Sequence, residues 1–297
     1  MIEQVVFFNN WHFGDVHSNK EYVRQFLDEF VRRGIGCVYA TVVPGRAINL
    51  PVECKNIYEY PHLTANPVSY FDEYSRTMYI NTWIGHYLVM NSHNFASQVA
   101  MWQDISGRVA AASNGEIVIG LKSDTMQYVS EIDESLLFPV IIPEGIKILF
   151  CNDAPISGQS HNGDWAEAIN KLASEYPDIK FVCTREIPVH HDNIIFTNDL
   201  TNRKEIVCDL PEIGHISEFC KIIITNSSGP GTFAMTRNNF LDNEKTIIAF
   251  VIGEGNTFWN GIEGVAAKTS WHNVFDDASV YQIIKDAINA QVFNYSS

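Results

Sequence analysis

A strand–helix–strand pattern at the start of the chain constrains the fold more than any other feature. Residues Gln4 to Asn10 and Gly36 to Val43 are rich in β-branched and aromatic residues, which is typical of strands. Between them, apolar residues recur every three or four positions, as on the buried face of a helix. The residues of this stripe are Val23, Phe26, Leu27, Phe30 and Val31. A helix joining two strands forms a βαβ unit, in which the strands run parallel.

The ends of this first helix are marked by capping residues. Ser18 and Glu21 have the spacing of a capping box, which predicts that the helix begins at Ser18. Gly34 is a natural C-terminal stop. The segment from His12 to His17 is then expected to be a loop at the end of the first strand.

The second half of the chain repeats this alternation, so we expect an α/β fold of two Rossmann-like domains that face each other across a cleft. The domains are expected at 1–140 and 141–297, joined near Pro139 to Gly145. In the first half we also expect a strand at Ile117 to Leu121 and a helix at Asp124 to Leu137. The expected strands and helices of the second half are Ile146–Asn152, Gly163–Tyr176, Ile179–Thr184, Asn193–Thr197, Ile213–Cys220, Lys221–Thr225, Phe233–Asn239, Lys245–Ile252 and Ser279–Val292.

Composition excludes several classes of protein. The formal net charge of −15 disfavours binding to a nucleic-acid polymer. The six cysteines include no CxxC pair, and the N-terminus lacks the pattern of a signal peptide, so we expect reduced thiols and a cytoplasmic setting. No apolar run approaches the length needed to span a bilayer, so we expect membrane contact to be peripheral at most.

The strongest candidate site runs from Asn226 to Thr232. It follows the apolar strand Ile222 to Ile224 and leads into a helix, which is where ligands bind in open parallel sheets. Glycines allow close approach of a phosphate to free helix amides, and hydroxyls add donors. The alternative is an ordinary capped turn, and the segment lacks the Gly-Lys-Ser/Thr of a Walker A loop. The candidate phosphate ligands are Ser227, Ser228, Gly229, Gly231 and Thr232.

A second candidate site lies after the first strand, where Gly14 permits a tight turn. Asp15 would place a carboxylate at the mouth of the sheet, able to take a proton from an acceptor hydroxyl, although it could instead cap the helix. His12 and His17 flank it and are candidate contacts to the acceptor.

Arg185 follows the strand Phe181 to Thr184 and could bind a diphosphate oxygen, although an exposed arginine is more often a solvated charge. Adjacent residues such as His190, His191 and Asp192 rarely converge on one ion, and no Asp-x-Asp pair is present. We therefore expect no metal and no cofactor.

The segment Phe13-Gly14-Asp15-Val16-His17 resembles the first loop of the heptosyltransferase-like, inverting GT-B glycosyltransferases. The turn from Asn226 to Thr232 resembles the turn that contacts the donor diphosphate in that group, but lacks its usual Asp and His. The resemblance implies two facing domains, Asp15 as catalytic base, and metal-independent transfer of a hexosyl, pentosyl or heptosyl group. The implied partners are a nucleotide sugar and a glycan or lipid-linked acceptor.

Two alternatives stay open from the sequence. A nucleotide-sugar 2-epimerase would have the same fold, but needs acid and base carboxylates around the sugar in both halves. A non-catalytic protein of two lobes would bind a sugar or small anion without preference for a nucleotide.

Overall fold

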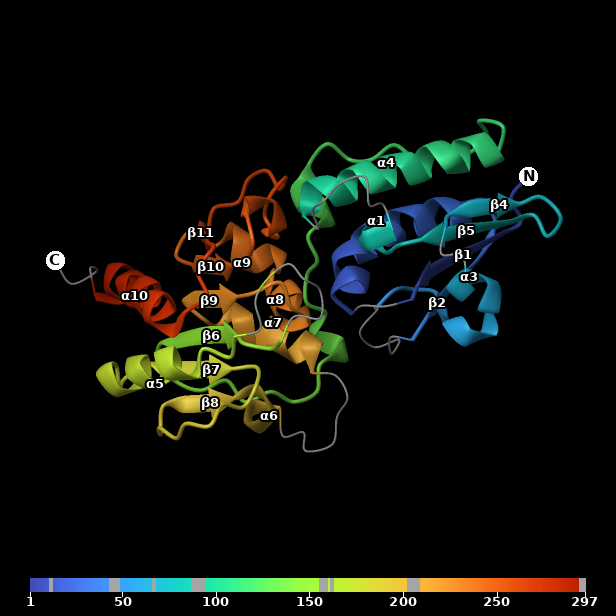
Figure 1. The fold of residues 1–297 in the computed structure, drawn as a ribbon. Helices are drawn as coiled ribbons and strands as arrows, with labels where there is room; N and C mark the ends of the chain where they lie inside the picture. The colour runs from blue at the N-terminus through green and yellow to red at the C-terminus, as the bar shows by residue number, and fades with distance from the viewer. Residues whose placement is uncertain are drawn as a thin grey trace. The chain divides into compact units, whose positions relative to one another are not determined.

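The computed structural model describes residues 1–10, 13–42, 49–65, 68–86, 94–154, 160, 163–201 and 209–293. The chain divides into two compact units. Unit 1 comprises Met1–Ser130 with Trp259–Glu263, and unit 2 comprises Glu131–Phe258 with Gly264–Ser297. Each unit is built on its own sheet flanked by helices (Figure 1). The predicted class of two α/β halves is confirmed, whereas their facing across a cleft stays a prediction.

Unit 1 contains a five-stranded sheet in the order β3-β2-β1-β5-β4. Strand β1 pairs in parallel with β2 and β5, β2 pairs in parallel with β3, and only β4 runs antiparallel to its neighbour. The strands are β1 (Gln4–Asn9), β2 (Gly36–Thr41), β3 (Glu53–Asn56), β4 (Tyr70–Asp72) and β5 (Thr77–Asn81). The predicted βαβ unit is confirmed, because α1 joins β1 to the parallel strand β2.

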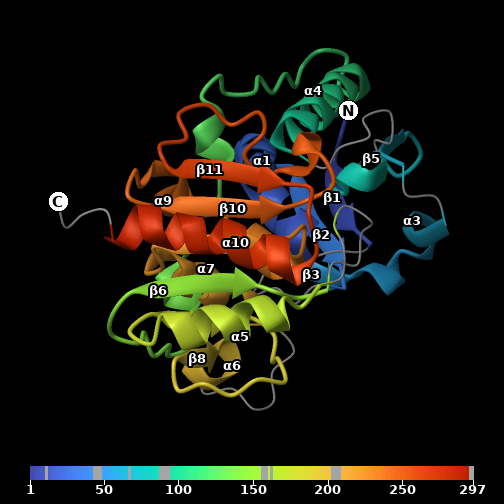
Figure 2. The ribbon, with the colours of Figure 1, turned by 60° about the vertical axis from the view of Figure 1, so that its left-hand side comes forward.

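Helices α1 and α4 lie side by side in unit 1 (Figures 1 and 2). The rings of Phe26 and Trp102 lie 4.9 Å apart, and those of Tyr22 and Tyr128 lie 3.9 Å apart. These fully or nearly buried aromatic side chains attach α1 to α4 and to the segment that follows it. The helices are α1 (Phe13–Arg32), α3 (Pro61–Ala65) and α4 (Phe95–Ala112), with short helical turns η1 (Ile57–Glu59), η2 (Ile84–His86) and η3 (Thr125–Tyr128).

Unit 2 contains a six-stranded sheet in the order β11-β10-β9-β6-β7-β8, in which every pair is parallel. The strands are β6 (Lys147–Cys151), β7 (Lys180–Cys183), β8 (Ile194–Phe196), β9 (Ile222–Thr225), β10 (Thr246–Phe250) and β11 (Lys268–His272). The helices are α5 (Ala166–Glu175), α6 (Thr197–Leu200), α7 (Leu210–Glu218), α8 (Gly229–Ala234), α9 (Arg237–Leu241) and α10 (Asp277–Ile288), with short turns η4 (Glu134–Leu136), η5 (Glu254–Asn256) and η6 (Asn289–Phe293).

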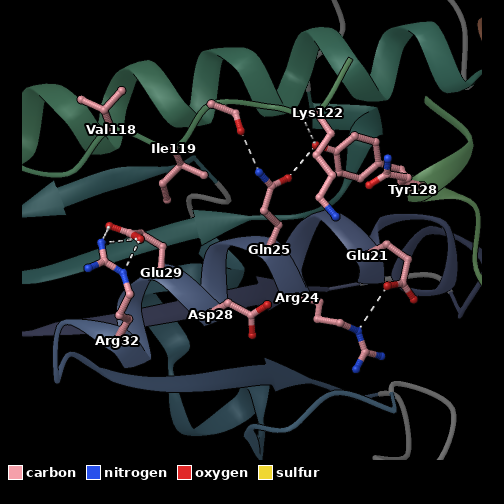
Figure 3. A pocket seen from close by; sticks show the side chains of 12 residues that line it. Glu21, Arg24, Gln25, Asp28, Glu29, Arg32, Val118, Ile119, Lys122 and Tyr128 are labelled. Atoms are coloured by element: carbon pink, nitrogen blue, oxygen red, sulfur yellow. Dashed lines mark hydrogen bonds and ion pairs between the residues drawn. The ribbon is translucent and has the colours of Figure 1, made fainter. Parts of the chain in front are cut away.

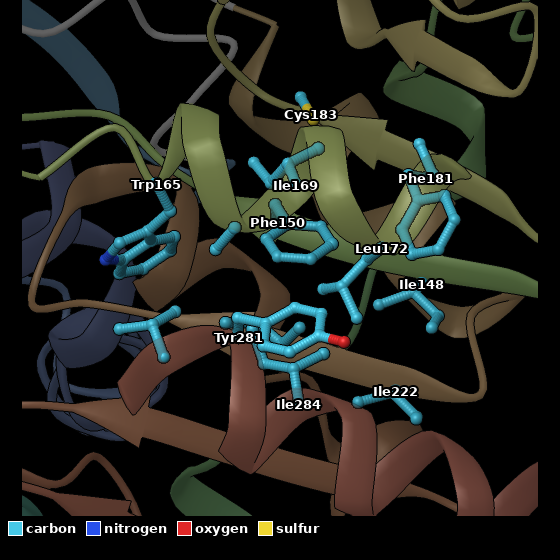
Figure 4. Close-up of a cluster of buried hydrophobic side chains, with 14 of the residues drawn as sticks. Ile148, Phe150, Trp165, Ile169, Leu172, Phe181, Cys183, Ile222, Tyr281 and Ile284 are labelled. Atoms are coloured by element: carbon cyan, nitrogen blue, oxygen red, sulfur yellow. The ribbon is translucent and has the colours of Figure 1, made fainter. Parts of the chain in front are cut away.

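Both faces of this parallel sheet are covered, as expected for such sheets. Helices α5 and α10 cover one face, and α7 and α9 lie on the other (Figure 2). Figure 4 shows the core under α5 and α10, where Leu172 and Ile284 meet strand residues such as Phe150. Burying an aliphatic or aromatic side chain of this size stabilises the fold by roughly 1.5–3 kcal/mol. This core packs α5 and α10 against the strands of unit 2.

The start of α1 differs from the prediction. The helix begins at Phe13, and the Ser18 hydroxyl donates to the carbonyl oxygen of Asp15 at 3.2 Å, inside the helix. The Glu21 side chain pairs with Arg24 at 3.2 Å. The predicted capping box and the loop up to His17 are therefore wrong, because the acidic Asp15 is itself favourable in a first helical turn. Gly34 has φ +73°, which confirms it as the C-terminal stop.

Two further predictions in the first half are wrong. Ile117 to Leu121 pairs with no strand, and the carbonyls of Ile119 and Gly120 accept side-chain hydrogen bonds instead. Asp124 to Leu137 forms only the turns η3 and η4, since the side chains of the aspartates that precede each turn cap them locally.

The expected helix Phe233 to Asn239 is divided in two. Thr236 accepts a hydrogen bond from the Asn239 amide at 3.2 Å and starts α9 after α8 has ended. Strands β3, β4, β5 and β11 were not predicted. Within the described ranges, no helix has the length and apolarity to cross a membrane.

Candidate functional site at the carboxyl ends of the two sheets

Asp15 lies in the first turn of α1, directly after β1. In a parallel sheet, this position is at the carboxyl edge, where ligands bind. Burial raises the pKa of Asp15 to about 7, while the residue keeps part of its surface exposed. No residue in the described ranges hydrogen-bonds to its carboxylate. An accessible carboxylate that exchanges its proton near neutral pH is suited to act as a general base.

The backbone beneath Asp15 is held firmly. Asn19 donates from its side-chain amide to the Asp15 carbonyl at 2.8 Å and accepts a hydrogen bond from the Trp102 indole at 2.7 Å. Both Asn19 and Trp102 are fully buried. These two hydrogen bonds hold the start of α1 against α4 and so fix the backbone position of Asp15.

Of the two histidines that flank Asp15, the structure describes only His17. His12 lies outside the described residues. His17 is 2% exposed, and burial, with a smaller contribution from the nearby Lys20 charge, lowers its pKa well below the ordinary value. The structure therefore places a neutral His17 inside unit 1, with Ser130 donating to its backbone carbonyl at 3.1 Å.

In unit 2, the turn after β9 is tied to the end of β6. The fully buried Asn226 donates to the Asp153 carbonyl at 2.8 Å, and the Ser227 amide donates to the Ser160 hydroxyl at 3.3 Å. The Asn226 Oδ1 atom is buried with no partner among the described residues. The predicted segment after β9 is thus joined to the residues that follow β6 at one edge of the sheet.

The first turn of α8 satisfies much of its own hydrogen bonding. Ser228 accepts from the Gly231 amide at 3.4 Å, and the Thr232 amide and hydroxyl both donate to the Ser228 carbonyl at 3.0 Å. A Cβ at Gly231 would lie 2.0 Å from Thr225 Oγ1, so only glycine fits there. Among the described residues, the Gly229 amide has no partner and is the first-turn donor best placed for an anion.

Arg185 lies just after β7 and is exposed. Its backbone amide donates to Asn152 Oδ1 at 3.0 Å, and its carbonyl accepts from Asn152 Nδ2 at 3.0 Å. These bonds fix Arg185 beside the end of β6, while its guanidinium makes no ion pair with a described carboxylate. The predicted ligands Arg185, Ser227 and Gly229 therefore all lie at the carboxyl edge of one sheet.

The sequence reasoning missed two carboxylates at this edge. Asp153 follows β6 and accepts a short hydrogen bond from the Thr184 hydroxyl. Burial raises the pKa of Asp209, and the charge of Asp153 adds to the rise. The rule that ligands follow strand ends could have identified Asp153. Asp209 had no such signal, because only the fold brings the start of α7 to this edge.

Among the described residues, no cluster of three or more histidine, cysteine, aspartate or glutamate side chains could hold a metal ion. His191 instead hydrogen-bonds to the Asn170 side chain at 2.9 Å. Metal independence stays a prediction.

A cavity of about 340 Å³ lies on the solvent side of α1 in unit 1, away from the predicted site residues (Figure 3). Gln25 donates to the Gly120 carbonyl at 2.7 Å and accepts from Tyr128 at 2.5 Å, which links α1 to the segment after α4. The wall carries charges of both signs, and Glu21 and Glu29 are paired with arginines of α1. The cavity has no marked preference for a cation or an anion.

No family model and no curated protein matches the sequence. Similar solved structures include a glycosyltransferase of family 9 from Veillonella parvula, at 14% identity over 96% of this chain and 91% of that one, with a TM-score of 0.44. The ADP-heptose lipopolysaccharide heptosyltransferase II of E. coli is 11% identical over 100% of both chains, with a TM-score of 0.49. S. aureus MnaA bound to UDP is 11% identical over 97% of this chain and 88% of that one, with a TM-score of 0.47.

Proposed function

We propose that the chain is a glycosyltransferase, which transfers a sugar from a nucleotide sugar to a hydroxyl group of a glycan or lipid-linked acceptor without a metal ion. The observation that carries the proposal is Asp15, a carboxylate at the carboxyl edge of a parallel sheet with a pKa of about 7 and no hydrogen-bond partner among the described residues. We infer a cytoplasmic reaction with at most peripheral membrane contact.

In the proposed reaction, the Asp15 carboxylate takes the proton of the acceptor hydroxyl as its oxygen bonds to the anomeric carbon of the donor. The bond from that carbon to the nucleoside diphosphate breaks, and the diphosphate leaves with the electron pair. A general base has to be ionised in a useful fraction of the molecules and still bind a proton strongly. A pKa near the working pH meets both requirements. His12 is the proposed contact to the acceptor, whereas His17 is too deeply buried to be one.

The carboxyl edge of unit 2 is the proposed donor site. The Arg185 guanidinium, the Gly229 amide and the hydroxyl of Ser227 would face the diphosphate, with Ser228, Gly231 and Thr232 shaping the turn. Donors that are fixed before the reaction stabilise a leaving anion without the cost of reorganisation. These donors would stabilise the negative charge of the leaving diphosphate, as a metal ion does in other transferases.

A nucleotide-sugar 2-epimerase is the second candidate, and Asp209 favours it. Epimerisation needs an acid or base in each half, and burial raises the pKa of Asp209 in unit 2 as it does that of Asp15 in unit 1. The two functions differ in their need for an acceptor. An epimerase converts its nucleotide sugar when incubated alone, whereas a transferase does not.

The first experiment is a thermal-shift screen with nucleoside diphosphates, nucleotide sugars and free sugars. A ligand at 100 times its Kd adds about 2.7 kcal/mol to stability. Stabilisation by nucleotide sugars supports the proposal, and stabilisation by free sugars alone indicates the non-catalytic binding protein. Product analysis of a stabilising nucleotide sugar, with and without a mixture of glycan acceptors, then separates transfer from epimerisation.

A further inference from the structure

A short segment of the chain, Trp259–Glu263, belongs to a different unit from the residues on either side of it. The residues up to Phe258 and from Gly264 onward are part of unit 2, whereas Trp259–Glu263 is part of unit 1. The segment lies in the connection between β10 and β11, two paired parallel strands of the unit 2 sheet. We call it the strap, because the connection leaves unit 2, attaches to unit 1 and returns.

The strap is attached to the first turn of α4. The first N–H groups of a helix have no acceptor within the helix and need one from outside it. The Ala96 amide, in the first turn of α4, donates to the carbonyl of Asn260 in the strap at 3.1 Å. The Ser97 amide donates to the side chain of the N-cap residue Asn94 at 2.9 Å. The start of α4 is therefore completed partly by its own cap and partly by the strap.

Gly261 allows the strap to lie directly on α4. Its φ of +93° lies in the region that favours glycine. A Cβ at this position would lie 2.7 Å from both the backbone nitrogen and the Cβ of Ala96, and helix backbone cannot move aside as a flexible side chain can. Gly264, directly after the strap, has a similar φ of +79°, but a Cβ there would meet no atom of the described residues within 4 Å. The two glycines thus share a backbone requirement, and only Gly261 has the contact with α4.

The strap has a second attachment, at η3. The Glu263 amide donates to the hydroxyl of Thr125 at 2.8 Å, and the Ile262 amide closes a turn onto the carbonyl of Trp259 at 2.9 Å. Aromatic side chains of α4 and of η3 both pack against α1, the helix that carries Asp15. The strap therefore holds the two elements of unit 1 that support this helix.

The connection that contains the strap begins beside the proposed donor site. Strand β10 pairs in parallel with β9, with Ala249 opposite Thr225, so the residues that follow β10 start next to the turn from Asn226 to Thr232. We propose that the strap couples the connection after β10 to the start of α4, so that loosening or stabilising one does the same to the other. Such coupling is reciprocal. Its extension to a ligand rests on the proposed function: a nucleotide bound at the carboxyl edge of unit 2 would stabilise the start of α4.

Hydrogen exchange of the full-length protein, followed by mass spectrometry, tests the coupling in both directions without a ligand. Gly261→Ala should raise the exchange rate at the start of α4 by about tenfold or more, because the new Cβ forces the strap off the helix. Gly264→Ala is the matched control, since it has the same backbone strain without the contact, and α4 should exchange within about twofold of wild type. Exchange in β6 serves as the reference for any global loss of stability.

Thr125→Val tests the opposite direction and replaces Gly261→Ala if that variant does not fold. It removes the acceptor of the Glu263 amide in unit 1, so exchange at residues 251–258 of unit 2 should rise by about threefold or more. Thr125→Ser keeps the hydroxyl and should exchange as the wild type. Unchanged exchange at the start of α4 in Gly261→Ala overturns the proposal, and so does unchanged exchange at 251–258 in Thr125→Val.

The ligand measurement uses ADP, GDP and UDP as probes. A nucleotide that stabilises the protein should slow exchange at the start of α4 in the wild type and in Gly264→Ala, but not in Gly261→Ala. Binding without slowing in the wild type, or equal slowing in all three proteins, contradicts transmission through the strap. If none of the three nucleotides stabilises the protein, the proposed donor site is contradicted, whereas the ligand-free result on the strap stands.

Discussion

Replacing Asp15 by asparagine should stabilise the protein at high pH. Burial raises the pKa of Asp15 from its ordinary value of 3.8 to about 7, so the folded state favours the protonated carboxyl group. Wild-type stability therefore falls as pH rises from about 4 to about 7, where the buried group must ionise. Asparagine resembles the protonated form and avoids this cost.

The magnitude follows from the shift. One pKa unit corresponds to about 1.4 kcal/mol, so the full difference above pH 7 is at most about 4.5 kcal/mol. Partial exposure of Asp15 reduces this value by solvent screening, and we expect a gain of about 2–3 kcal/mol at pH 8. Near pH 4, the two proteins should differ by less than about 1 kcal/mol.

Urea denaturation at pH 4, 6 and 8 measures this difference. Asp28→Asn is the matched control, because Asp28 is an exposed aspartate on the same helix and its replacement should change stability by less than about 0.5 kcal/mol at each pH. A constant difference between Asp15→Asn and wild type from pH 4 to pH 8 would refute the burial argument. So would a loss of stability that grows with pH.

Three further predictions concern activity and stability. Asp15→Asn should leave nucleotide-sugar binding within twofold in a thermal-shift titration and lower turnover by about 10²–10⁴, as expected for loss of a general base; unchanged turnover removes Asp15 from the mechanism. Gly231→Ala should cost about 1–3 kcal/mol by urea denaturation, because its Cβ would lie 2.0 Å from Thr225 Oγ1, whereas Gly229→Ala, with its nearest atoms at 3.8 Å, should cost less. Lys245→Met should cost about 2–4 kcal/mol, since the buried Lys245 ammonium donates to the carbonyls of Ser217, Glu218 and Cys220 at the end of α7; a stability equal to wild type would show that those carbonyls find other donors.

The βαβ unit and the parallel sheets were predictable from the sequence, because periodicity and composition depend on neighbours in the chain. The stripe residues from Val23 to Phe30 are buried as expected, but Val31, also predicted to be buried, is 62% exposed near the end of α1. Every strand predicted in the second half is present. The helix boundary at Ser18 was wrong, because the helix already begins at Phe13, with the acidic Asp15 in a favourable position in its first turn. Short-range signals also failed at Ile117 to Leu121, where side chains of α1 and α4 take the carbonyls that a neighbouring strand would use.

For the candidate site too, the sequence predicted some features and the tertiary structure was needed for others. The sequence predicted Asp15, Arg185 and the segment from Asn226 to Thr232 as site residues, because residues that follow the strands of a parallel sheet lie at the carboxyl edge of that sheet. Only the tertiary structure showed which polar groups there are already engaged, such as the Gly231 amide, and which are buried enough to change their proton affinity, such as Asp15 and Asp209. Residue type and order are local properties of the chain, whereas desolvation and hydrogen-bond partners depend on segments that folding brings together.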